Sequence, residues 1–231
     1  MSVVEHFGVE SGPARPGWLE LDVAAATAVF LYLVGGVAAY FVSEDFPIAL
    51  GHVNFLISGL APLGAFAVAV LVRIRDVRPF GLRHTSLLWL LTGVVIGLVC
   101  FGLSWPVSAI FDPLFPGSEG VQQPYRDAAR SGAVPPIVAV GLGGILTPLG
   151  EEALFRGVLA TFLFRWGSCV SVVFSAAVFA VAHGINGVMP LALMIGLTNG
   201  VLLWCSGSIW PAVMVHIAYN SAGIVYHGLG Y

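Results

Sequence analysis

The sequence has little charge, and it contains no lysine. Only 9% of its 231 residues are charged, whereas 58% are hydrophobic. Soluble domains carry about 25% charged residues, so this composition, with a mean hydropathy of +0.94, excludes an ordinary soluble protein. The net charge of −3 is too small to indicate nucleic acid as a partner. The sequence therefore predicts an integral membrane protein whose surroundings are the lipid bilayer.

Cysteine is also scarce. Cys100, Cys169 and Cys205 all lie in apolar runs, and their spacing fits no zinc or redox motif. We interpret them as small hydrophobic residues. The first twenty residues lack a basic segment followed by a short apolar core, so we expect no cleavable signal peptide.

Long hydrophobic runs, by contrast, follow one another along the chain. A helix needs about 20 apolar residues to cross a hydrocarbon core of about 30 Å. The fold class predicted from these runs is all-α, a polytopic bundle of about seven or eight transmembrane helices. The eighth span would arise if the long fourth run is broken at Pro148, where a kink is expected. The seven expected spans are residues 23–42, 53–72, 86–105, 136–165, 168–183, 188–205 and 208–226.

Two adjacent carboxylates, Glu151 and Glu152, interrupt the fourth run. A charge inside a bilayer costs roughly 2.5–3.5 kcal/mol even on the lenient insertion scale, so such residues are functional by default. On a helix, Glu152 and Arg156 share a face and can pair, whereas Glu151 points about 100° away. We interpret Glu152–Arg156 as a structural pair and Glu151 as the working group. The alternative is that both carboxylates lie at the membrane interface beside a cytoplasmic loop.

Two further polar clusters fall in later apolar runs. Phe179 and His183 are four residues apart, as are His216 and Asn220, so each pair lies on one helix face. Each cluster alone has a plainer explanation, which stays open. His183 could be a core histidine bonded to a backbone carbonyl, and His216 with Asn220 could be an interhelical polar contact.

The spacing of these clusters brings Glu151 and His183 level with each other. With a turn at residues 166–167, Glu151 lies about 15 residues before it and His183 about 16 after it, so both lie roughly 23–25 Å along their helices. A buried carboxylate is a better base near neutral pH, and a neighbouring histidine can orient or share the proton of a water molecule. A second histidine and an amide nitrogen are donors suited to a developing oxyanion.

The three clusters together resemble the motifs of the CPBP intramembrane proteases. That family includes the CAAX prenyl endopeptidases and prokaryotic bacteriocin-processing or immunity proteins. The resemblance covers about residues 135–226, and it divides the chain into a polar tail at 1–22, accessory transmembrane helices with loops at 23–133, and a CPBP-like catalytic core at 134–231. The motifs are Glu151-Glu152-x-x-x-Arg156, Phe179-x-x-x-His183 and His216-x-x-x-Asn220.

The resemblance implies an enzyme of the prokaryotic plasma membrane, a glutamate-dependent CAAX-type intramembrane endopeptidase. Its substrate would be a membrane-anchored protein or peptide. By the same resemblance, Glu151 and His183 activate water, and His216 and Asn220 stabilise the oxyanion. The supporting residues implied are Glu152, Arg156 and Phe179.

We expect no cofactor. The alternative is zinc, held by Glu151, His183 and His216, because two histidines and a glutamate form a known catalytic zinc set and family names often include the word metalloprotease. Against zinc, Asn220 is a poor zinc ligand and the two histidines lie on different helices, with no His-Glu-x-x-His turn.

Two other functions remain as alternatives. The chain could be a non-catalytic membrane immunity or partner protein, or a transporter with an intramembrane proton relay. One more intramembrane polar residue, Asn199, is interpreted as a contact that holds helices together.

Overall fold

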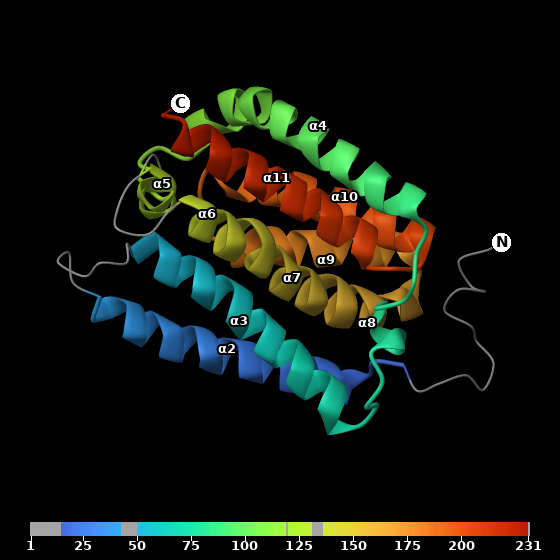
Figure 1. The fold of residues 1–231 in the computed structure, drawn as a ribbon. Coiled ribbons are helices and arrows are strands. Elements are labelled where there is room, and N and C mark those ends of the chain that lie inside the picture. Colours follow the sequence, from blue (N-terminus) through green and yellow to red (C-terminus); the bar gives the residue numbers. More distant parts are fainter. Residues whose placement is uncertain (1–14, 43–49, 119, 131–135, 231) are drawn as a thin grey trace.

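The structure is a computed structural model that describes residues 15–42, 50–118, 120–130 and 136–230. Within these ranges the chain forms helices joined by short turns and no strand, which confirms the predicted all-α fold. The long helices lie side by side as a bundle, with a short helix at one end (Figure 1). Outside the fourth predicted span, the helices are α2 (Trp18–Tyr40), α3 (Leu50–Val72), α4 (Leu87–Phe111), α5 (Gln123–Arg130), α9 (Ser168–Ala182), α10 (Met189–Ser206) and α11 (Trp210–Gly228).

Five helices among the described residues are long and apolar enough to cross a membrane. They account for five of the expected spans, and the chain is an integral membrane protein. The remaining two expected spans form α9 and α11, with 15 and 19 residues. The five are Trp18–Tyr40, Leu50–Val72, Leu87–Leu114, Ile137–Trp166 and Met189–Ser206.

Helix α2 begins at Trp18, upstream of the expected start at residue 23. The additional residues at the start of this helix include the charged residue Glu20. Glu20 is fully buried, and the Arg73 guanidinium reaches it from the far end of α3, with Nε 2.6 Å from Oε1. The same carboxylate accepts a hydrogen bond from the backbone N–H of Gly17, which caps the helix. A neutralised and capped carboxylate can start a membrane helix.

The fourth predicted span is one continuous helix, Ile137–Trp166, so the eighth span does not form. Pro148 lies in its central part, α7 (Thr147–Glu152), between two wider π-helical segments. Proline removes the donor that would reach the carbonyl four residues earlier, that of Gly144. The Ser221 hydroxyl of α11 lies 3.5 Å from this carbonyl oxygen. The segments in chain order are α6 (Pro136–Ala139), η3 (Val140–Leu146), α7, η4 (Ala153–Ala160), α8 (Thr161–Leu163) and η5 (Phe164–Trp166).

Two close backbone contacts fix how the helices approach one another. A Cβ added at Gly150 of α7 would lie 2.1 Å from the carbonyl oxygen of Gly59 on α3. A Cβ added at Gly97 of α4 would lie 2.4 Å from the carbonyl oxygen of Val215 on α11. Because lipid tails are as apolar as the side chains, helices in a membrane associate through such close packing. These contacts hold α3 and α4 on either side of the helices that carry the polar clusters.

We expect Gly97→Val to destabilise the protein, because the added side chain must push α4 away from α11. Overpacking of this kind costs about 1–3 kcal/mol, which will lower the thermal midpoint of the purified protein in detergent. Gly102→Val is the matched control, since Gly102 lies in the same helix and an added Cβ there meets nothing within 4 Å. Equal midpoints for the two variants would contradict the close contact.

Candidate active site

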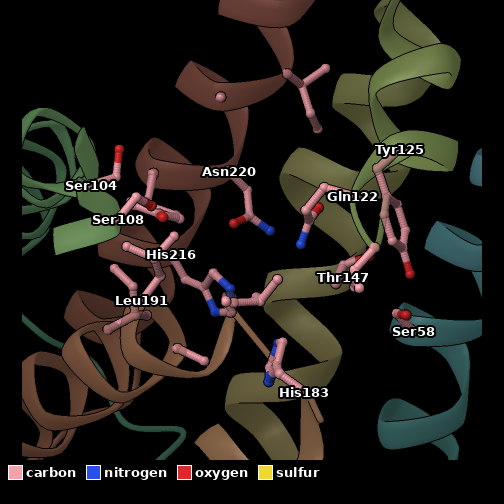
Figure 2. A pocket seen from close by; sticks show the side chains of 18 of the residues that line it. Ser58, Ser104, Ser108, Gln122, Tyr125, Thr147, His183, Leu191, His216 and Asn220 are labelled. Carbon is pink, nitrogen blue, oxygen red and sulfur yellow. The ribbon is translucent and has the colours of Figure 1, made fainter. Parts of the chain in front are cut away.

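The polar residues singled out in the sequence come together from three helices. Glu151 and Glu152 end α7, and His216 lies in α11. His183 is the residue that directly follows α9, at its C-terminal cap rather than inside the helix as expected. Figure 2 shows His183, His216 and Asn220 projecting into one pocket.

Glu151 lies between the two histidines. Its Oε2 atom is 3.9 Å from His183 Nε2 and 3.7 Å from His216 Nε2. The Glu151 residue is 6% exposed, and its Oε2 atom has no hydrogen-bond partner among the described residues. The number of residues from each side chain to the turn at 166–167 predicted that Glu151 and His183 lie at the same depth. The structure brings the two side chains together.

In each histidine, the hydrogen-bond partner of Nδ1 determines which ring nitrogen carries the proton. His183 Nδ1 lies 2.8 Å from the Phe179 carbonyl oxygen, and His216 Nδ1 lies 2.8 Å from Glu152 Oε1. A carbonyl or an ionised carboxylate can only accept, so Nδ1 carries the proton in both rings. In a neutral ring, Nε2 is then an unprotonated acceptor that faces Glu151.

Glu152 is held by Arg156, as the four-residue spacing predicted. The Arg156 Nε atom is 3.1 Å from Glu152 Oε2, and both side chains are fully buried. Arg156 also donates a hydrogen bond to the Gly196 carbonyl of α10 at 3.0 Å. A buried carboxylate is tolerated only with such a partner, so Arg156 allows Glu152 to remain charged beside His216.

Phe179 supports both histidines and the arginine through its ring. The ring centroid is 4.6 Å from that of His183 and 5.8 Å from that of His216, with edge-on geometry in each case. The Arg156 guanidinium lies over the same ring at 4.5 Å. One aromatic side chain therefore packs against three of the polar groups and excludes water from the Arg156 side.

Asn220 lies one helical turn after His216 and lines the same cavity. Its Nδ2 donates to the Gly143 carbonyl of η3 at 3.0 Å. An amide nitrogen has two hydrogens, so this bond uses one of them and fixes the plane of the amide group.

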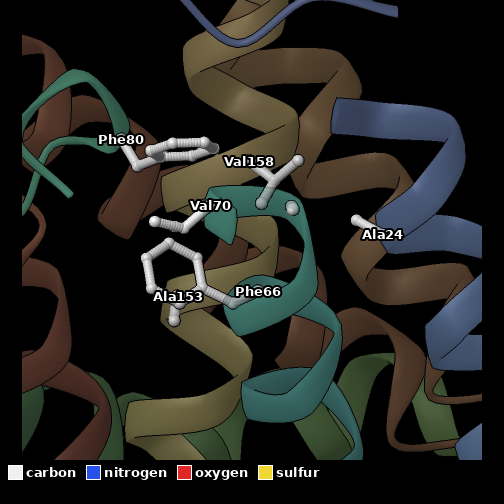
Figure 3. Packing of buried hydrophobic residues seen from close by; sticks show 7 residues of the cluster. Ala24, Phe66, Val70, Phe80, Ala153 and Val158 are labelled. Carbon is white, nitrogen blue, oxygen red and sulfur yellow. The ribbon is translucent and has the colours of Figure 1, made fainter. Parts of the chain in front are cut away.

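The segment that carries both glutamates is anchored on another face by a cluster of buried apolar side chains (Figure 3). Ala153 and Val158 of η4 meet Phe66 and Val70 of α3, and Phe80 from the turn between α3 and α4 closes the cluster. Phe80 is fully buried. Tight packing of this kind limits movement of the helix that presents Glu151.

The cavity beside these residues has a volume of about 840 Å³. Its wall contains Glu151, His183, His216 and Asn220, whereas Glu152 and Arg156 lie behind the wall. Sites that hold small molecules or short peptide segments commonly fall in the range of about 300–1,000 Å³. The polar cluster is therefore placed where a substrate could reach it.

One comparison with known proteins identifies the region that carries this site. Residues 133–222 match the family model described as type II CAAX prenyl endopeptidase Rce1-like. The match covers this region, which is less than half of the chain. The recognition made from the three motifs is thereby confirmed, and the family is one of CAAX-type intramembrane proteases. No curated protein and no solved structure matched the chain in the other two comparisons.

The Rce1-like region contains all seven residues proposed for the site, but it does not form the whole cavity. Segments that precede residue 133 also contribute to the wall: Ser108 from α4, Asp112 from the turn that follows it, and Tyr125 and Arg126 from α5. None of these four residues was predicted from the sequence. They lie in or beside a connection without a recognisable motif, and the packing of α4 and α5 against α11 brings them to the site.

Asn199 also contacts the site in a way that the sequence did not reveal. It was interpreted as a general contact between helices, but its amide donates to Glu152 Oε1 at 2.9 Å. The only signal in the sequence was its unusual polarity within an apolar helix.

Zinc held by Glu151, His183 and His216 is the alternative to a water molecule that these residues hold directly. Among the described residues, no group of three or more histidine, cysteine or carboxylate side chains could hold a metal ion.

We expect Arg156→Met to lower the stability of the folded protein by about 3–5 kcal/mol, because it removes the arginine that pairs with the buried Glu152 charge. The double variant Glu152→Gln/Arg156→Met removes both charges and should recover part of the lost thermal midpoint. Arg165→Met is the control, since Arg165 lies at the exposed end of the same helix. If the double variant is less stable than Arg156→Met alone, the ion-pair explanation is wrong.

Proposed function

We propose that the chain is an intramembrane endopeptidase that hydrolyses a peptide bond in a membrane-associated protein or peptide. The observation that carries the proposal is the position of Glu151 Oε2, 3.7 and 3.9 Å from two histidine Nε2 atoms and in the wall of the cavity. A general base must lie within reach of the proton it removes, directly or through one water molecule. These separations are wide enough for a water molecule to contact Glu151 and a histidine together.

In the proposed reaction, Glu151 removes a proton from water while His183 Nε2 accepts the second hydrogen bond of that water. The resulting hydroxide attacks the carbonyl carbon of the substrate, and the carbonyl oxygen becomes an oxyanion. Glu151 then delivers its proton to the leaving amine nitrogen, so no proton is lost or gained overall. No serine or cysteine nucleophile is needed.

The oxyanion is stabilised by His216 and Asn220. His216 donates from Nε2 in its doubly protonated form, and the Glu152 carboxylate at Nδ1 stabilises the imidazolium as the carboxylate of a catalytic triad does. Asn220 donates the amide hydrogen that its bond to Gly143 leaves over. Donors fixed in advance in this way stabilise developing charge without reorganisation.

The substitution Glu151→Gln keeps the shape of the side chain and removes the base. We expect peptidase activity to fall by at least about a hundredfold, measured as new peptide termini in membranes from cells that express each variant at equal levels. Asp76→Asn is the control, since Asp76 lies in the exposed turn after α3 and pairs with Arg78. Matching termini in wild type and Glu151→Gln would show that the chain acts as a binding or immunity protein instead.

Treatment with a metal chelator distinguishes the glutamate mechanism from that of a zinc enzyme. Activity of the purified protein should survive prolonged dialysis against a zinc chelator and should not increase when zinc is returned, because Glu151 and His183 hold the water directly. Loss of activity on chelation, followed by recovery with zinc, would refute the metal-independent mechanism.

A further inference from the structure

Helix α10 contributes one side chain to the polar network behind the cavity wall. Asn199 is fully buried, and its Nδ2 lies 2.9 Å from Glu152 Oε1. The same oxygen accepts from His216 Nδ1 at 2.8 Å. Asn199 is not in the wall of the cavity, so it can influence a substrate only through Glu152 and His216.

The Glu152 carboxylate determines the orientation of the Asn199 amide. An ionised carboxylate accepts hydrogen bonds and cannot donate them, so the nitrogen of the Asn199 amide faces Glu152 and the oxygen faces away. The Asn199 Oδ1 atom is buried and has no hydrogen-bond partner among the described residues. A buried acceptor without a partner is destabilising, which argues against a residue present only to hold helices together.

The neighbouring residue shows what an ordinary polar side chain does in this helix. The Thr198 hydroxyl donates to the Met194 carbonyl one turn earlier at 2.8 Å, within α10 itself. That is the usual way for a threonine to satisfy its hydroxyl inside a helix. Asn199, in contrast, directs its donor across to α7.

We propose that Asn199 is a positioning residue that fixes the Glu152 carboxylate so that His216 presents Nε2 to Glu151. Arg156 holds Oε2 of this carboxylate, and Asn199 and His216 share Oε1. Without Asn199, the carboxylate keeps one fixed oxygen and can rotate about it, and the His216 ring turns with it. This inference rests on the proposed endopeptidase function and assigns to it a residue outside the three motifs.

The test uses the full-length protein in lipid nanodiscs, with a peptide that spans a cleavage site identified by comparing the wild type with Glu151→Gln. Asn199→Leu keeps the side-chain volume and removes the donor. We expect kcat to fall about ten- to a hundredfold, as for the loss of one hydrogen bond to a charged group, with KM unchanged because Asn199 does not touch the substrate. Thr198→Val is the matched control and should retain the wild-type kcat.

A second background shows whether Asn199 acts through Glu152. In Glu152→Gln, the further change Asn199→Leu should have little additional effect on kcat, since residues that act through one another are not additive. An equal loss in both backgrounds would overturn the proposal. So would a rise in KM at constant kcat.

Nitrogen-15 NMR examines His216 directly, without substrate turnover. In nitrogen-15 spectra of histidine-labelled protein, Asn199→Leu should shift the His216 ring signals and leave those of His183 in place, because His183 Nδ1 is bonded to Phe179 instead. Thr198→Val should shift neither. Unchanged His216 signals in Asn199→Leu would overturn the proposal.

These outcomes distinguish a failure of the proposed endopeptidase function from a failure of the role proposed for Asn199. If the wild type shows no activity that depends on Glu151, the proposed function fails, whereas the His216 signals still test Asn199. If activity depends on Glu151 but Asn199→Leu equals the wild type, only this inference fails. Asn199→Ala provides a smaller second variant. If neither variant accumulates in the membrane although Thr198→Val does, Asn199 is a structural residue and the proposal is wrong.

Discussion

The arrangement of the site depends on one buried carboxylate, that of Glu152. Three side chains from three helical segments meet it: Arg156 from η4, Asn199 from α10 and His216 from α11. A charge without partners would be too costly at this depth, so these helices have to pack in the one relative position that supplies all three. The group that stabilises the interior therefore also orients a residue of the proposed active site.

The second constraint is that the helices are surrounded by lipid. Because apolar burial does not drive association there, close backbone approach and internal hydrogen bonding take its place. Gly97 allows α4 to approach α11, and Gly150 allows α7 to approach α3. Around Pro148, π-helical segments and a side chain from α11 complete the helix that a proline in lipid would otherwise disrupt. Both glutamates lie in α7, between these two π-helical segments. Segments of this kind are frequent at functional sites.

Several features were predictable from local chemistry. Composition and hydrophobic run length determine a helical membrane bundle, since few other structures satisfy the backbone in lipid. The four-residue spacing of Glu152 and Arg156 predicts an ion pair that the structure contains. Two local predictions needed correction. The first helix begins at Trp18, before the expected residue 23, and Arg73 neutralises the buried Glu20 in its first turn. Pro148 does not divide the fourth span into two.

By itself, the sequence determined the fold class, the membrane location and the residue types of the candidate site, because spacing along a helix and the cost of charge in lipid are local properties. Only the tertiary structure decided which ring nitrogen of each histidine faces Glu151, that Asn199 bonds Glu152, and that α5 lines the cavity. These depend on how helices distant in sequence are rotated and placed against one another, and helical spacing does not specify the partner face.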